Sequence, residues 1–141
     1  MSEIPNSLIA AYTETHYRVF ASDATLTLRI GAHSEPLAKL HTQFDVTSSA
    51  LLTAYNPGSD PTTDPRANLA AQASLVAALE AAGLQWTAAE GADPTGKWPT
   101  EPSVLVLGIS RDQAAALAQQ FQQNAFVFSD ALALPALVLL R

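Results

Sequence analysis

The order of strand-like and helix-like segments between residues 49 and 128 constrains the fold of this 141-residue chain more than any other feature. The pattern of apolar and turn residues predicts, in order, a strand over 49–55, an alanine-rich helix over 65–82, strands over 84–89 and 103–108, a helix over 111–123 and a strand over 125–128. This βαββαβ order is that of a ferredoxin-like unit. We therefore predict an α+β fold with a ferredoxin-like core at about 49–128, whose helices lie mainly on one face of a largely antiparallel sheet.

Segments on either side of this core are predicted to extend the sheet. An N-terminal helix-hairpin-helix is expected, with helices capped by Asn6 or Ser7 and by Ser34, and with hairpin strands over 17–21 and 25–30. The second of these helices has a predicted buried stripe of Leu37, Leu40 and Phe44. A last strand is predicted over 136–140. With 48% hydrophobic and 14% charged residues, the chain is predicted to form one α+β domain over 1–141.

The charge balance and the missing cysteines exclude several classes of function. The chain has 7 basic and 13 acidic residues, a net charge of −6, which argues against nucleic acid as a partner. The absence of cysteine excludes disulfides, thiolate nucleophiles and iron–sulfur clusters. The histidines at 16, 33 and 41 do not have the spacing of metal ligands, so we expect neither a metal nor a cofactor.

Two further patterns bear on where the protein is found. The longest apolar stretch, 131–140, contains Pro135 and is too short for a membrane helix. No basic residue precedes Arg18, which is unlike the charged start of a signal peptide. We therefore expect a cytoplasmic protein without a membrane partner.

The predicted topology brings three connections to one end of the sheet. They are the loop at 56–64, the loop at 90–102 and the corner at 122–124. Six of the nine prolines lie in or beside the first two connections, which are therefore long but restricted in conformation. Long, stiff loops at one end of a sheet are where binding sites are commonly built, so we predict a site formed by 56–68, 90–102 and 122–124.

Several segments of these loops and strands resemble a known family. They are residues 53–57 (TAYNP), 93–103 (DPTGKWPTEPS), 105–109 (LVLGI) and 121–125 (FQQNA). In this order and spacing they resemble a bacterial domain-of-unknown-function family, number 3293. The family usually has glycine after the phenylalanine, where this chain has Gln122. The resemblance points to the same loops as the topology and implies no particular activity.

The loop end carries side chains that suit a small ligand, although each has an alternative structural role. Trp98 could stack on a planar ligand or pack the loop onto the core. Asn56 and Asn68 could orient a polar molecule, or could stabilise a turn and the first turn of a helix. The segment 91–97 matches the start of a phosphate-binding P-loop, but Trp98 and Pro99 replace the Ser/Thr and the helix that such a loop needs.

The charged residues at this end allow acid–base chemistry but do not favour it. Asp60, Asp64, Asp93 and Glu101 are all predicted to lie there, yet aspartate before proline is also common in turns. Arg66, at the start of the helix over 65–82, could hold a carboxylate or phosphate of a ligand. We therefore expect no catalytic residue.

These observations lead to one prediction and one alternative. We predict that the protein binds a small polar metabolite at the loop end through Asn56, Arg66, Asn68, Asp93, Trp98, Glu101 and Asn124. The alternative is a protein-interaction or regulatory module without catalysis, because ferredoxin-like sheets also pair with partners through their edges. Either a monomer or a small homo-oligomer is compatible with the sequence.

Overall fold

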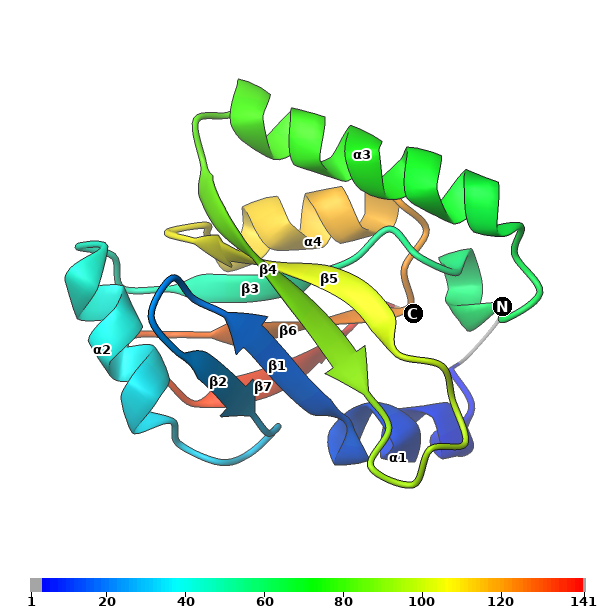
Figure 1. Cartoon of the computed structure of the whole chain (residues 1–141), viewed down its shortest axis with the longest axis horizontal. Helices are drawn as coiled ribbons and strands as arrows, with labels where there is room; N and C mark the ends of the chain where they lie inside the picture. The colour runs from blue at the N-terminus through cyan, green and yellow to red at the C-terminus, as the bar shows by residue number, and fades with distance from the viewer. Residues whose placement is uncertain (1–3, 141) are drawn as a thin grey trace.

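Four adjoining strands form the centre of the sheet in a computed structural model, which describes residues 4–140 (Figure 1). They are β4 (Gln85–Ala92), β5 (Glu101–Leu107), β3 (Ser49–Leu52) and β6 (Ala125–Ser129), in this spatial order. β1 (His16–Phe20) and β2 (Thr25–Leu28) continue the sheet beyond β4, and β7 (Pro135–Leu139) continues it beyond β6. All neighbouring strands are antiparallel. The prediction of a mixed fold with an antiparallel sheet is therefore confirmed for the described residues.

The two α-helices within residues 49–128 lie on one face of this sheet, and a helix that precedes this segment covers the opposite face. On one face, α3 (Pro65–Ala81) and α4 (Arg111–Gln120) pack against the sheet through residues such as Leu79 and Ala118. On the opposite face, α2 (Glu35–Gln43) packs against it through Leu37 and Leu40. Figure 1 shows α3 and α4 above the sheet and α2 at its left end. The physical reason lies in β3 and β5, whose consecutive apolar side chains are buried on both faces and need cover on both.

The first helices differ from the prediction in two details. Ser34 caps α2, because its hydroxyl oxygen accepts a hydrogen bond from the Leu37 N–H at 3.2 Å, as predicted. α1 (Asn6–Glu14) has Pro5 at its N-cap and no side-chain cap, so the expected capping by Asn6 or Ser7 is wrong. Phe44 is 36% exposed and does not belong to the buried stripe of α2. The reason is that α2 ends at Gln43, so the backbone at Phe44 no longer follows the helix.

The strand predicted over 49–55 ends at Leu52, because hydrogen bonds that involve side chains replace the strand pairing of the residues that follow. The Thr53 hydroxyl donates to the Pro102 carbonyl at 2.7 Å, and the Gln72 side-chain oxygen accepts the Ala54 N–H at 2.8 Å. Asn56 then adopts a left-handed conformation with φ of 47°. The chain therefore leaves the sheet early and turns into the short 3-10 helix η1 (Pro57–Ser59).

The helix predicted over 111–123 ends at Gln120, and the chain reverses at Gln122. Gln122 has a φ of 59°, and the Gln123 N–H donates to the Ala118 carbonyl at 2.9 Å, which is the pattern of a glycine-favouring helix end. This explains why a glycine belongs at this position. We expect Gln122→Gly to raise the free energy of unfolding by about 1 kcal/mol in urea denaturation. Gln119→Gly, inside α4, is the matched control and should lower it by about 1 kcal/mol; equal effects of both substitutions would contradict this interpretation of Gln122.

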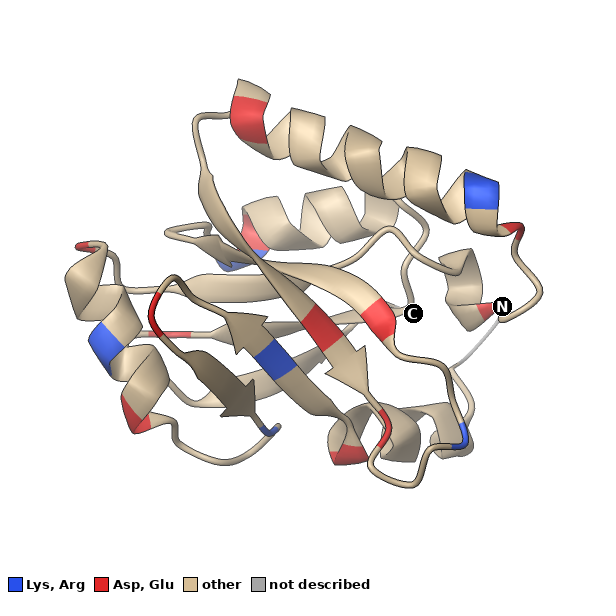
Figure 2. Cartoon of the chain, in the orientation of Figure 1, with Lys and Arg blue, Asp and Glu red and all other residues tan. Residues whose placement is uncertain are grey.

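In the part of the chain that the structure describes, basic residues do not cluster, and the helices are not of the membrane-spanning kind. Figure 2 shows the Lys and Arg residues of the described chain scattered over separate helices, strands and loops. Between residues 4 and 140, no helix has the length and apolar character needed to cross a membrane.

Candidate functional site

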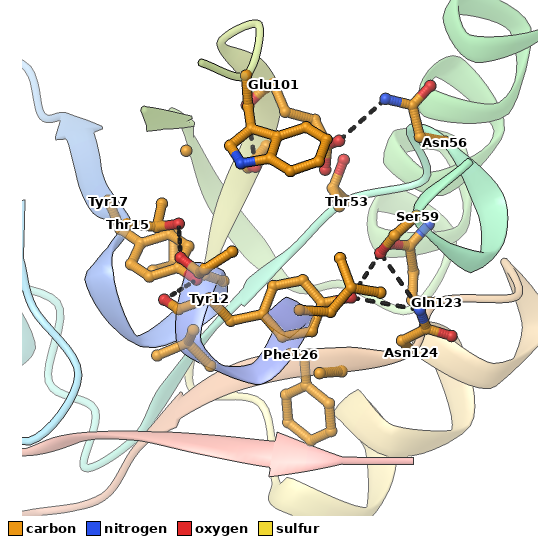
Figure 3. A pocket seen from close by; sticks show the side chains of 18 of the residues that line it. Tyr12, Thr15, Tyr17, Thr53, Asn56, Ser59, Glu101, Gln123, Asn124 and Phe126 are labelled. Atoms are coloured by element: carbon orange, nitrogen blue, oxygen red, sulfur yellow. Dashed lines mark hydrogen bonds between the residues drawn. The ribbon is translucent and has the colours of Figure 1, made fainter. Parts of the chain in front are cut away.

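A cavity of about 180 Å³ lies where the three connections meet α1 (Figure 3). The segment after β3 contributes Asn56 and Ser59, the β4–β5 connection contributes Trp98, and the corner before β6 contributes Asn124. Tyr12 of α1 completes the wall. Residues that are far apart in the sequence thus surround one space at the end of the sheet.

Five of the seven residues singled out from the sequence line this cavity: Asn56, Asp93, Trp98, Glu101 and Asn124. Asn68 does not line it, but it contacts Asn56 and lines a neighbouring hollow that also includes Glu101. Arg66 is exposed in the first turn of α3 and lines neither space. That any of these residues binds a ligand stays a prediction.

Asn56 connects the first turn region of α3 to the cavity through three hydrogen bonds. Its backbone N–H donates to Asn68 Oδ1 at 2.8 Å, and its own Oδ1 accepts from Asn68 Nδ2 at 2.8 Å. Its Nδ2 donates to Glu101 Oε2 at 3.2 Å. Asn68 is 6% exposed, so this pair is held in a largely buried place. The amide of Asn56 is thereby fixed in orientation, with its donor directed at the carboxyl group of Glu101.

Glu101 is the most unusual ionisable group of the cavity. It begins β5 and is only partly exposed, and burial raises the pKa of its carboxyl group to about 7. The hydrogen bond from Asn56 acts in the opposite direction and lowers this pKa. Neither Arg nor Lys forms an ion pair with Glu101 among the described residues. At neutral pH its carboxyl group therefore exchanges between the neutral and the ionised form.

The aspartates near the cavity have structural roles in turns and caps. The Asp93 carboxylate accepts the backbone N–H groups of Thr95, Lys97 and Trp98 and the Thr95 hydroxyl, and these hydrogen bonds lower the pKa of Asp93. Asp60 holds Thr62 in the same way, and Asp64 caps α3 by accepting the Arg66 N–H at 2.9 Å. Each of these carboxylates therefore accepts hydrogen bonds within its own turn or cap, whereas that of Glu101 accepts one from Asn56, in another segment. The element that follows the segment 91–97 is the strand β5 and not the helix that a P-loop needs.

A hydroxyl and amide cluster on the other side of the cavity was not predicted from the sequence. The Tyr12 hydroxyl shares a short hydrogen bond with the Ser59 hydroxyl, and Asn124 Nδ2 donates to both oxygens at 3.2 Å (Figure 3). Gln123 Nε2 donates to the Tyr55 carbonyl at 3.0 Å and joins the corner to the segment after β3. Nothing local in the sequence indicates that α1 crosses the loop end, so Tyr12 could not be assigned to this cavity in advance.

Trp98 does not close the loop onto the core. Its side chain is 51% exposed, although it lines the cavity. The backbone beneath it is fixed by Asp93, which accepts the Trp98 N–H at 3.1 Å. The structure therefore presents an indole at the cavity on a backbone that is itself well ordered by hydrogen bonds.

Comparison with known proteins places the chain in a protein family. The family described as "Protein of unknown function (DUF3293)" matches residues 52–126, which is more than half of the chain. The chain belongs to this family. The DUF3293 segment begins at the end of β3 and reaches into β6, so it contains Asn56, Asn68, Glu101 and Asn124 but not Tyr12 of α1. Neither a curated protein nor a solved structure matches the chain.

Proposed function

We propose that this chain binds a small polar molecule in the cavity between α1 and the loop end. One observation carries the proposal: the three connections bring to one space an exposed indole, several fixed amides and a partly buried carboxyl group that has no ion-pair partner within residues 4–140. A carboxyl group held in this way reduces the stability of a fold, so a binding role is a physical reason for its presence. Cavities that combine apolar walls with a few oriented polar groups are the usual form of a ligand site.

Binding without catalysis is the function that the side chains favour. General acid–base catalysis commonly uses two titratable groups whose pKa values are moved apart. Here the second carboxyl group at the cavity, Asp93, accepts hydrogen bonds from four donors that fix its loop. The Ser59 hydroxyl contacts Tyr12 and Asn124 rather than a base. We therefore propose a binding role for Glu101 and Asn56, with Asn124 and Trp98 as further contacts.

Thermal unfolding against a panel of amino acids, amines, organic acids, nucleotides and metal ions tests this function. A ligand at about 100 times its Kd adds about 2.7 kcal/mol to the free energy of unfolding and raises Tm visibly. We expect Trp98→Ala to abolish the effect of a hit. Trp86→Ala is the matched control, because Trp86 is also partly exposed, at 36%, but lies on β4 and does not line the cavity. A hit that Trp98→Ala leaves unchanged would contradict a site at the loop end.

An interaction module is the second candidate, and the edge of the sheet at β7 favours it. Leu132, Leu134 and Leu139 are exposed in and before this edge strand, at 68%, 40% and 42%. Exposed apolar edges are sites at which sheets pair with other chains. If no molecule of the panel stabilises the protein while its mass in light scattering rises with concentration, the interaction module replaces the binding proposal.

We also propose that residues 49–129 form a ferredoxin-like core. The spatial order β4-β5-β3-β6 and the position of α3 and α4 on one face of these strands support this topology. In this arrangement the connections after β3, after β4 and before β6 belong to one end of the core. The proposed binding end would then be a consequence of the core topology.

A further inference from the structure

We propose that the cavity binds a small organic cation, a protonated amine with a compact apolar body, whose ammonium group contacts Glu101. This inference rests on the proposed function and specifies the chemical class of its ligand. Three features of the cavity support it: the sign of its charge, the free oxygen of Glu101, and its size and apolar wall.

The charge of the cavity favours a cation. Among the described residues that line it, the carboxyl groups are those of Asp93 and Glu101, and none is Lys, Arg or His. The neighbouring hollow also lacks basic side chains among its described lining residues. An anionic ligand would therefore lose its hydration without gaining a positive partner, which is costly. A cation gains a negative partner in the same place.

The hydrogen bonds of Glu101 leave one oxygen for a ligand. Asn56 Nδ2 donates to Oε2, and no other described side chain or backbone group donates to the Glu101 carboxyl group. The Asn56 amide cannot rotate to compete for the ligand, because its Oδ1 is held by Asn68 Nδ2 at 2.8 Å. The second oxygen of Glu101 can therefore accept a hydrogen bond from an ammonium group, which is among the stronger kinds of hydrogen bond.

The remaining wall suits the body of such a molecule. A cavity of about 180 Å³ is close in size to one that holds a single benzene ring, which needs about 150 Å³. Leu8, Val127 and Leu137 provide apolar contacts, and the indole of Trp98 offers an aromatic face for cation–π attraction near the entrance. The Tyr12, Ser59 and Asn124 cluster provides neutral polar groups away from Glu101.

Three probes of one shape test the charge preference directly. Benzylamine, benzyl alcohol and benzoate have the same ring and differ in the head group, which is cationic, neutral or anionic. We expect benzylamine to bind most tightly at pH 8 in an NMR titration, with shifts concentrated at the backbone amides of Asn56, Trp98 and Glu101. Glu101→Gln should weaken benzylamine at least about tenfold and leave benzyl alcohol within about twofold, because only the ammonium group loses a charged partner. Glu90→Gln, which alters a carboxylate on β4 outside the cavity, is the matched control and should change neither.

Raising the pH from 6 to 8 should strengthen benzylamine binding about tenfold, because the fraction of ionised Glu101 rises over this range. The other titratable groups at the cavity are Asp93, Tyr12 of α1 and Tyr17 of β1. The pKa of Asp93 is lowered by its hydrogen bonds and that of Tyr17 is raised by burial, so neither changes charge between pH 6 and 8. Glu101→Gln should remove the pH dependence.

The outcomes separate this proposal from the one on which it rests. If benzoate binds as tightly as benzylamine, or if Glu101→Gln weakens all three probes equally, the cation preference is wrong, while binding in the cavity stands. If none of the probes shifts the cavity amides but an anionic or neutral molecule of the wider panel does so, the ligand class is again overturned and the proposed function stands. If neither the probes nor the panel affects the cavity, both proposals fail.

Discussion

Glu101→Gln is expected to stabilise the protein by about 3 kcal/mol at pH 8 and to change its stability little at pH 4, according to the relation between pKa and folding. The reason is the difference between the two states of the chain. In the folded protein burial raises the pKa of Glu101 to about 7, against 4.5 for an exposed glutamate. Glutamine retains an acceptor for Asn56 Nδ2 but carries no charge that burial can penalise.

The sign of the pH dependence follows from the same difference. Because the folded state binds the Glu101 proton more tightly than the unfolded state, this group favours folding below pH 4.5. Its contribution is lost as the pH rises through the folded pKa of about 7, when the carboxyl group ionises in a partly buried place. Urea denaturation of the natural protein and of the variant between pH 4 and pH 8 measures the difference directly.

Glu90→Gln serves as the control for a general effect of removing negative charge. Glu90 lies on the adjacent strand β4 and its Oε2 is 2.7 Å from Arg18 Nη1 at the surface. Because exposed ion pairs contribute about 0–1 kcal/mol, this substitution should be neutral or slightly destabilising at pH 8. Equal stabilisation by both substitutions would show that net charge, and not the burial of Glu101, is responsible.

The sequence predicted the kinds and order of the elements well, because those depend on residues that are neighbours in the chain. Ser34 predicts the start of α2, and the alanine-rich run over 65–82 predicts α3. The cover on the second face of the sheet was missed. The buried runs of β3 and β5 contain apolar residues in consecutive positions, and such runs can be covered on one face or on both. Whether one face or both are covered depends on where α2 packs, and that depends on contacts between residues far apart in the sequence.

For the candidate site, the sequence predicted the loops that form it but not all the contacts between them. Topology indicated which loops meet, but the Tyr12 contacts with Ser59 and Asn124 join residues 47 and 112 positions apart. One local pattern identifies the aspartates that form turns. The segments 60–62 and 93–95 both read Asp-Pro-Thr, and in both the aspartate accepts the N–H and hydroxyl of the threonine two residues later. The segment 101–103 reads Glu-Pro-Ser, but there the Ser103 hydroxyl donates to the Glu101 backbone carbonyl and not to its carboxyl group.

Asn56→Ala is expected to lower the free energy of unfolding by about 2–4 kcal/mol, from the loss of buried hydrogen bonds and from backbone strain. The substitution removes the partner of Asn68 Nδ2, which lies in a largely buried side chain. It also places alanine at a φ of 47°, where asparagine is tolerated better. Urea denaturation at pH 7 measures the change.

Asn56→Gly separates these two causes, because glycine loses the same hydrogen bonds but adopts a left-handed backbone without strain. We expect it to be more stable than Asn56→Ala by about 1 kcal/mol. Both variants should raise the pKa of Glu101 further, since the Asn56 donor lowers it in the natural protein, and an NMR titration of the Glu101 carboxyl carbon follows this. If both variants unfold like the natural protein and the pKa of Glu101 does not move, the amide of Asn56 does not hold that carboxyl group. The ammonium site proposed here would then lack the fixed second partner on which its geometry depends.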